Sequence, residues 1–334
     1  MKAISIFYLL LFYITIQLVW WGNLLIRLQK TSKSMVIGEG LVFLGLLGIG
    51  TYYLQRAIKR EEAHERIKRL KEQQDGDYYL TSLLSNPLSK NNNDSVIIKT
   101  ECYLQQHKNF QFMDWKTSLG GDLCLTERIV LANGKNYTVY LNADAMGKSL
   151  QGAAGSLLLG SAVHSILLKD KKEGFKAFSP TDWLTETYSS IRDFFMIFGG
   201  AMLVSLTLGI IEEETGECFF WNAEHPFQIL YRNREVSYIE NSVTMNKIGF
   251  DAESDLTIQR ITLLPGDVVI LGSDGKDDLN LAPHHRKKQI NEDPDFFLKI
   301  TKDASGNIKK IMEKIFSIGE PTDDLSIIRI EYCP

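Results

Sequence analysis

The sequence contains little cysteine and has no large excess of either charge. Its four cysteines are scattered over 334 residues without a CxxC pair, which argues against a thiolate zinc site and against a dense disulfide framework. We interpret them as reduced side chains in the core of an intracellular domain. The 37 basic and 41 acidic side chains give a net charge of −4, so the composition does not indicate a nucleic acid as partner.

Long apolar runs are concentrated near the N-terminus. Residues 3–26 carry no charged side chain, and as a helix they would extend about 36 Å, enough to cross a bilayer. A second run covers residues 35–54 and is interrupted only by Glu39. No small-residue cleavage site follows the first run, which favours an uncleaved anchor over a signal peptide. Residues 1–55 are therefore predicted to form two transmembrane helices with a short connection at 27–34.

The distribution of basic residues predicts the orientation of these helices. Three basic residues lie in the connection, whereas seven follow the second run within residues 56–71. Because basic residues are retained on the cytoplasmic side, the chain beyond the second helix is expected there, and so is the N-terminus. This predicts a multi-pass protein of the inner (cytoplasmic) membrane with its larger part in the cytoplasm.

Residues 55–76 connect the membrane segment to the rest of the chain. Residues 55–75 contain no glycine or proline and mix both charge signs around a thin apolar stripe. Such a pattern is typical of a signalling helix or short coiled coil, through which the chain would form a homodimer; a solvated charged spacer fits it equally well. Residues 73–76 are expected to be coil, followed by one larger domain over residues 77–334.

Within this domain, strands come first, then helices, then strands again. The order predicts an α/β (α+β) domain. The expected strands cover residues 95–104, 110–115, 122–131, 137–144, 201–211, 217–221, 228–231, 256–264, 267–272 and 325–330. The expected helices cover residues 149–168, 180–195, 286–300 and 305–317. The basic cluster at 284–288 is interpreted as a solvated helix start, with steering of a phosphorylated partner or contact with the membrane surface as alternatives.

The strongest local signal is Asn133-Gly134 between two alternating apolar runs, which predicts a β-hairpin. A two-residue turn would place Asp144 opposite Leu123, one position away from Asp122. A one-residue bulge would instead place the two aspartates directly across from each other. Because like charges at this distance repel, a cation is expected between them.

Acidic residues also occur at the ends of two later strands. Asp274 follows a buried apolar strand, and Asp323 and Asp324 precede the final strand. Carboxylates without histidine or cysteine favour Mg²⁺ or Mn²⁺ over zinc or copper. Aspartates are also common in turns, and a turn would explain any one of these positions. It does not readily explain all of them together, because the hairpin also brings Asp122 and Asp144 close to each other.

Five short motifs in this sequence resemble, in the same order, those of the SpoIIE-like members of the PPM (type 2C) phosphatases. They are Gly120-Gly121-Asp122, Asp144-Ala145-Met146-Gly147, Asn222-Ala223-Glu224-His225-Pro226, Ser273-Asp274-Gly275 and Thr322-Asp323-Asp324. The resemblance covers about residues 77–334. It implies a four-layer α-β-β-α sandwich of two mainly antiparallel sheets, a metal-dependent serine/threonine protein phosphatase activity, and two Mn²⁺ or Mg²⁺ ions at one edge.

The resemblance also implies a role for each motif residue. Asp144 would bridge the two ions, and the carbonyl of Ala145 would complete one site. Asp274 and Asp323 would hold one ion with it, and Asp122 would act through coordinated water or as an outer ligand. Two divalent ions about 4 Å apart lower the pKa of a bridging water, and the resulting hydroxide would attack phosphorus. The implied metal-binding positions are Asp122, Asp144, Ala145, Asp274, Asp323 and Asp324; in this family the first acid of the final pair usually takes the metal.

The sequence departs from the family pattern at three places. Lys148-Ser149 stands in place of His-Gly, Glu224 stands in place of a glycine, and Asp278 stands where a glutamate is common after the Asp-Gly pair. Lys148 would contact the substrate phosphate or simply lie at a helix start, and His225 would shuttle protons or pack behind the site. The residues for which a catalytic role is considered are Asp144, Asp274, Lys148 and His225.

Together these observations predict a membrane-anchored, Mn²⁺- or Mg²⁺-dependent phosphoserine/phosphothreonine phosphatase. The resemblance suggests a role in bacterial partner-switching signalling, with a phosphorylated anti-sigma-factor antagonist as the substrate. One alternative is a catalytically inactive phosphatase fold that serves as a binding or scaffold module, motivated by Lys148 and Glu224. Another is a metal-dependent hydrolase of small phosphate esters.

Overall fold

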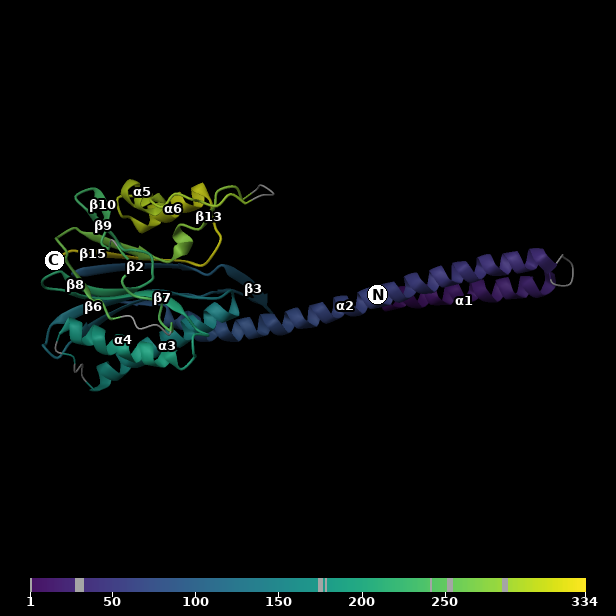
Figure 1. Ribbon diagram of the computed structural model, residues 1–334, viewed down its shortest axis with the longest axis horizontal. Helices are drawn as coiled ribbons and strands as arrows, with labels where there is room; N and C mark the ends of the chain where they lie inside the picture. Colours follow the sequence, from purple (N-terminus) through teal and green to yellow (C-terminus); the bar gives the residue numbers. More distant parts are fainter. Residues whose placement is uncertain are drawn as a thin grey trace. The chain divides into compact units, whose positions relative to one another are not determined.

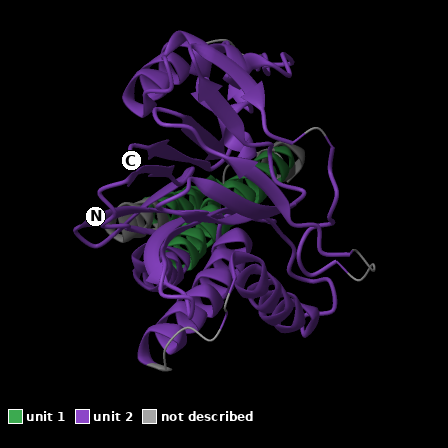
Figure 2. Ribbon diagram, turned by 90° about the vertical axis from the view of Figure 1, so that its left-hand side faces the viewer, with its two compact units in different colours: residues 1–72 green, residues 73–334 purple. Residues whose placement is uncertain are grey.

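The computed structural model describes residues 2–27, 33–173, 177, 179–240, 242–250, 255–283 and 288–334. The chain divides into two compact units, Met1–Glu72 and Gln73–Pro334 (Figure 2). Most of the expected connection at 27–34 and of the basic cluster at 284–288 lies outside the described residues.

Two long helices make up the first unit. Helix α1 (Lys2–Arg27) packs antiparallel to the first part of α2 (Lys33–Ser85). The Tyr13 hydroxyl donates a hydrogen bond to the Leu47 carbonyl (3.2 Å), and the Trp20 ring stacks on Phe43 with centroids 3.8 Å apart. A side chain at Gly50 would meet the Tyr13 ring, so a glycine at this position allows the two helices to approach closely.

Many apolar side chains in the first part of α2 point outward from this helix pair. Leu41, Val42, Leu44 and Leu46 are each more than 60% exposed. Among the described residues, two helices are long and apolar enough to cross a membrane, namely α2 from Gly40 onward and α3 (Leu150–Glu173). The apolar part of α3 is 44% buried, whereas that of α2 is not buried at all. Packing in the protein core therefore accounts for the apolar character of α3 but not for that of α2.

The expected coil at residues 73–76 is wrong, because α2 continues through it to Ser85. The end of the helix packs on the hairpin of β3 (Lys108–Phe112) and β4 (Trp115–Leu119). Tyr78 lies edge-on to Phe110, with ring centroids 5.5 Å apart, and Tyr79 stacks on Phe112 at 5.3 Å. These aromatic contacts outweigh the low helix propensity of the glycine within the expected coil.

Four layers, α-β-β-α, make up the second unit (Figure 1). In spatial order, the six-stranded sheet contains β1 (Lys90–Asn92), β5 (Asp122–Val130), β6 (Asn136–Ala145), β7 (Val204–Glu212), β8 (Glu217–Ala223) and β11 (Gln259–Thr262). The five-stranded sheet contains β10 (Glu235–Tyr238), β9 (Ile229–Arg232), β12 (Val268–Gly272), β15 (Leu325–Tyr332) and β2 (Ile98–Gln105). All neighbouring strands are antiparallel except the β1–β5 pair. The expected four-layer arrangement is therefore the observed one.

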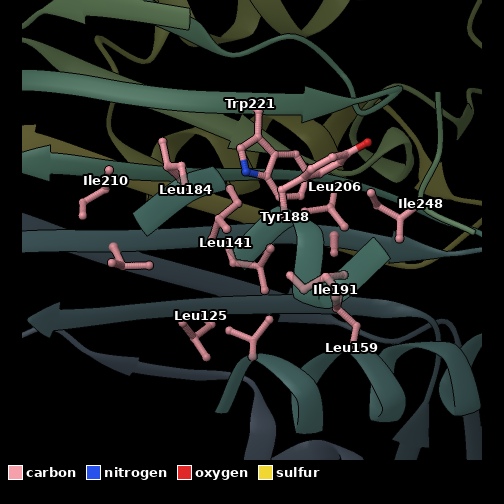
Figure 3. Close-up of a cluster of buried hydrophobic side chains, with 14 of the residues drawn as sticks. Leu125, Leu141, Leu159, Leu184, Tyr188, Ile191, Leu206, Ile210, Trp221 and Ile248 are labelled. Carbon is pink, nitrogen blue, oxygen red and sulfur yellow. The ribbon is translucent and has the colours of Figure 1, made fainter. Parts of the chain in front are cut away.

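Helices cover the outer faces of both sheets. Helices α3 and α4 (Pro180–Met196) cover the six-stranded sheet, and α5 (Phe296–Asp303) and α6 (Ile308–Ile318) cover the other (Figure 1). In the first helix–sheet core, strand residues such as Leu141 and Trp221 meet Leu159, Tyr188 and Ile191 of the helices (Figure 3). Two further buried clusters fill the space between the sheets and beneath α5 and α6.

Several element boundaries differ from the sequence-based expectation. Helix α4 begins at the predicted position, where Ser179 and Asp182 form a reciprocal capping box. The helix expected over 286–300 is wrong in its described first half, because residues 288–295 form a loop containing Pro294 and only α5 is helical. The single strand expected at 110–115 is instead the β3–β4 hairpin.

Candidate active site

The β5–β6 hairpin sets the register on which the candidate site depends. The expected two-residue turn is wrong: Val130 pairs with Asn136, and the Gly134 N–H donates to the Leu131 carbonyl (2.9 Å). Gly134 adopts φ +78°, as the last position of a three-residue hairpin loop requires. The additional residue lies in the turn and not in a strand, and at the other end of the hairpin it places Asp122 directly opposite Asp144.

Asp122 lies at the buried end of the site. Its side chain is 2% exposed, and neither carboxylate oxygen has a hydrogen-bond partner among the described residues. Burial raises the pKa of Asp122, and the charges of Asp144 and Asp324 raise it further, whereas the Ser273 and Ser326 hydroxyls lie near enough to lower it in part. A buried carboxylate without partners is costly, so this position favours a bound cation.

Asp144 and the Ala145 carbonyl lie beside it on β6. Burial raises the pKa of Asp144 to about 7, with further contributions from the carboxylates of Asp274 and Asp323. An added Cβ at Gly121 would overlap the Ala145 carbonyl oxygen, so the second glycine of the Gly-Gly-Asp motif leaves room for that oxygen. The Gly121 carbonyl in turn accepts a hydrogen bond from the Ala145 N–H (3.1 Å).

The five-stranded sheet contributes Asp274 and Asp323 at the rim of the site. Asp274 follows β12 at the start of a short 3₁₀ turn, and Asp323 precedes β15. Both side chains are exposed. Desolvation on one side of Asp274, together with the nearby carboxylates of Asp278 and Asp323, raises its pKa, although the side chain still reaches solvent. The backbone after it approaches β15 closely, since an added Cβ at Gly275 would overlap a backbone oxygen there.

Asp324 has its hydrogen-bonding capacity satisfied by the backbone. One oxygen accepts the His107 N–H (2.6 Å) and the other accepts the Gly121 N–H (2.6 Å). An added Cβ at Gly120 would overlap the Asp324 carboxylate, which explains the first glycine of the Gly-Gly-Asp motif. Asp324 thus lies near Asp122, and its hydrogen bonds hold the backbone that leads to Asp122.

His225 lies buried between the sheets and the pocket. Its Nε2 lies 2.7 Å from Asn142 Oδ1 and its Nδ1 lies 3.2 Å from Ser205 Oγ. Because the Asn142 amide nitrogen donates to Ser326, its oxygen faces the ring, which assigns the proton to Nε2. Burial, together with nearby lysines, lowers the pKa of His225 to about 3. A neutral ring held at both nitrogens matches the structural alternative better than a proton shuttle.

Two of the departures from the family pattern occur where the backbone is left-handed. Glu224 has φ +50° and Ser149 has φ +54°. Residues other than glycine are strained there by roughly 1–2 kcal/mol, which accounts for the glycines that the family has at these positions. Lys148, next to Ser149, is exposed and does not line the pocket described below.

The donor set suits a hard divalent cation. Carboxylate oxygens from both sheets and one backbone carbonyl converge at one edge, and a buried carboxylate there lacks a partner. As they stand, no three His, Cys, Asp or Glu side chains of the described residues lie close enough together to hold one ion.

A pocket of about 500 Å³ opens beside these carboxylates. Its lining residues are Asp144, Ser205, Glu224, His225, Pro226, Phe227, Val243, Lys247 and Asp274. Sequence reasoning missed Lys247, because it lies in an irregular segment that matches none of the five motifs. The only sequence signal is its place between Met245 and Ile248, two apolar residues that the structure buries.

The fold is similar to that of PP2C phosphatase domains. The SiaA-PP2C domain of Pseudomonas aeruginosa superimposes with a TM-score of 0.56 at 15% identity, covering 80% of this chain and 98% of that one. The PP2C domain of SpoIIE from Bacillus subtilis, with a fragment of its regulatory domain, gives 0.51 at 17% identity, covering 72% and 64%. The RsbU and RsbW domains of Rv1364c from Mycobacterium tuberculosis give 0.55 at 15% identity, covering 71% and 60%.

This chain thus spans less than two thirds of the length of the last two structures. Comparison with curated protein sequences gives no match. Residues 134–332, more than half of the chain, match the family model of stage II sporulation protein E. The match includes four of the five motifs, all but Gly120-Gly121-Asp122. The chain belongs to the stage II sporulation protein E (SpoIIE) family, and its second unit has the fold of a PP2C phosphatase domain.

Proposed function

We propose that this chain is a Mn²⁺- or Mg²⁺-dependent protein phosphatase that hydrolyses phosphoserine or phosphothreonine. The observation that carries the proposal is the opposed pair Asp122 and Asp144, of which the buried member has no partner for either carboxylate oxygen in the described structure. Two like charges held face to face in a buried place destabilise the fold unless a cation lies between them.

The residues that we propose to hold the ions come from both sheets. Asp122, Asp144 and the Ala145 carbonyl would hold ions from the six-stranded sheet, and Asp274 and Asp323 from the other. When bound, the ions would supply Lewis-acid stabilisation of the phosphoryl oxygens and activation of water. The exposed rim and the open pocket leave room for a phosphorylated side chain presented by another protein.

The substrate is proposed to be a phosphorylated regulatory protein of the anti-sigma-factor antagonist class. The support is membership of the SpoIIE family and the fold shared with the RsbU and RsbW domains of Rv1364c. A partner-switching role for this chain follows from the same likeness.

Residues 1–55 are proposed to anchor the protein in the cytoplasmic membrane as a multi-pass segment, with the phosphatase unit in the cytoplasm. The support is the outward-facing apolar surface of α2 and the excess of basic residues that follows it. Extraction of membranes with sodium carbonate tests this proposal, since an anchored chain stays in the pellet and a peripheral one is released.

Hydrolysis of p-nitrophenyl phosphate by the full chain, purified in detergent, tests the proposed activity. Activity should require Mn²⁺ or Mg²⁺, disappear with EDTA, and be lost in Asp144→Asn and Asp274→Asn. Asp114→Asn, at an exposed turn of the β3–β4 hairpin, is the matched control and should retain activity. Activity that survives EDTA would contradict the metal requirement. A chain that neither hydrolyses the ester nor binds Mn²⁺ would instead be a scaffold.

A further inference from the structure

The pocket beside the carboxylates has one basic residue among its lining. Lys247 lines the pocket together with the acidic residues Asp144, Asp274 and Glu224. Val243 and Phe227 supply apolar surface nearby. A lysine beside carboxylates that would be occupied by metal ions suits a ligand that carries negative charge.

The backbone fixes the position of Lys247 from both sides. On one side, Ile248 exchanges two hydrogen bonds with Val204 at the start of β7 (2.9 and 3.0 Å), and its side chain lies in the first helix–sheet core (Figure 3). On the other side, Met245 is 2% exposed and forms a parallel bridge with Ala223 at the end of β8. Lys247 therefore extends from a segment that both ends hold in place.

The ammonium group of Lys247 has no ion-pair partner within the part of the chain that the structure describes. Its side chain is half-buried and not extended into solvent. It is close enough to the carboxylates for its charge to lower the pKa of Asp144 and of Asp274, against the larger effect of desolvation. Lys247 is thus a half-buried cation that lies beside carboxylates but forms no salt bridge with them. A negatively charged ligand in the pocket would supply the partner that its ammonium group lacks.

The charge balance of the site supports this interpretation. Two divalent ions would neutralise the four carboxylates of Asp122, Asp144, Asp274 and Asp323. Lys247 and Glu224, which form no salt bridge with each other in the described structure, would then be the remaining charged side chains of the pocket lining. A phosphate monoester carries a charge of about −1.5 to −2 near neutral pH, together with three strong acceptor oxygens. A lysine ammonium binds such a group as a point charge with three donors.

We propose that Lys247 binds the phosphate group of the substrate in the pocket beside Asp144 and Asp274. This inference rests on the proposed function and assigns the substrate phosphate a direct protein contact. It also replaces Lys148, for which the sequence suggested this role, because Lys148 does not line the pocket. No covalent step is involved, since Lys247 contributes charge and hydrogen bonds only.

Steady-state kinetics of the full chain with p-nitrophenyl phosphate and Mn²⁺ provides the test. Lys247→Met keeps the length of the side chain and removes its charge, whereas Lys247→Arg keeps the charge. Loss of one charge-assisted contact should raise KM, and the inhibition constant of inorganic phosphate, about tenfold or more in Lys247→Met. Lys247→Arg should recover most of this loss. Lys309→Met, on the exposed face of α6, is the control and should match the wild type.

Stability and metal binding distinguish phosphate binding from a structural role of Lys247. If Lys247 binds phosphate, Lys247→Met should leave the melting temperature and the Mn²⁺ dissociation constant unchanged, or tighten Mn²⁺ binding slightly because a competing cation has been removed. A structural role would instead lower the melting temperature. Unchanged KM and unchanged phosphate inhibition in an active Lys247→Met would overturn the inference while leaving the proposed function intact.

Calorimetry separates this failure from a failure of the proposed function. If the wild type hydrolyses no ester, the proposed function fails, and titration of inorganic phosphate into the Mn²⁺-loaded protein then decides the role of Lys247. Phosphate binding that weakens about tenfold in Lys247→Met would support the inference on its own. Equal binding by both proteins, or binding by neither, would overturn it.

Discussion

Asp122 and Asp324 are neighbouring buried aspartates that belong to different regions, the start of β5 and the loop before β15. Burial raises the pKa of both. Asp324 has each oxygen 2.6 Å from a backbone N–H, whereas Asp122 has no partner within the described residues. Burial and charge are thus common to both positions, and hydrogen bonding distinguishes them. The same substitution is therefore expected to have opposite consequences for stability at Asp122 and at Asp324.

Of the substitutions that test this comparison, Asp122→Asn should have the largest effect on Mn²⁺ affinity and activity. Removing the charge should lower Mn²⁺ affinity and phosphatase activity about 10–100-fold, as for other residues that act on a metal through water or an outer contact. It should also stabilise the metal-free protein near pH 8, because a neutral amide is less costly to bury than a carboxylate. Mn²⁺ titration calorimetry and urea unfolding followed by tryptophan fluorescence measure the two effects. A variant with lower stability and full Mn²⁺ affinity would reverse our assignment of Asp122.

Asp324→Asn should act in the opposite direction on stability. The amide nitrogen of asparagine would face one of two backbone N–H donors, so one charge-assisted hydrogen bond is lost and replaced by a conflict between donors. The expected loss is about 2 kcal/mol of unfolding free energy, with or without Mn²⁺. Urea unfolding measures it, with Asp114→Asn as the control. If Asp324→Asn proved as stable as the wild type but lost Mn²⁺, Asp324 would be a ligand, as its place in the motif first suggested.

The stability of the metal-free protein should depend on pH through Asp144, the residue opposite Asp122. The pKa of Asp144 in the folded chain is about 7, above its ordinary value, so the folded state holds a proton that the unfolded state has already released. The contribution of Asp144 to the unfolding free energy should therefore be largest below about pH 4 and should be lost as the pH rises through about 7. Mn²⁺ affinity should rise over the same interval, because binding displaces the proton. Unfolding in EDTA at several pH values tests this, and Asp144→Asn should flatten the dependence.

The smallest expected effect concerns the backbone beside the site. Ser149 is held at φ +54°, and Ser149→Gly should relieve part of that strain at some entropic cost, for a net stabilisation of about 0.5–1 kcal/mol. Activity should not change, because the substitution removes no group that faces the pocket. A shift in the urea midpoint measures the gain. A destabilised Ser149→Gly would show that the serine side chain makes up for the strained backbone.

The sequence predicted most of this fold and part of the site, for reasons that particular residues make clear. Alternation in strands and the capping box at Ser179 are local signals, and both appear where expected. The opposed aspartates depended on one residue in the turn, which Asn133-Gly134 leaves undetermined because it fits both a two-residue and a three-residue loop. Lys247 could not be identified, because only long-range pairing of Ile248 with Val204 brings it to the carboxylates.

The loop at residues 132–134 affects the candidate site from a distance. It lies at the opposite end of the hairpin from Asp122, roughly 25–30 Å away along the strand. If Ala132 instead paired with Lys135 across a two-residue turn, the register would shift by one position, Asp144 would face Leu123, and the two aspartates would point to opposite faces of the sheet. Substitutions at Asn133 or Gly134 that favour one turn type over the other are therefore expected to change metal binding, although neither residue lies near the carboxylates. The conformation of a remote turn thus bears directly on the active site.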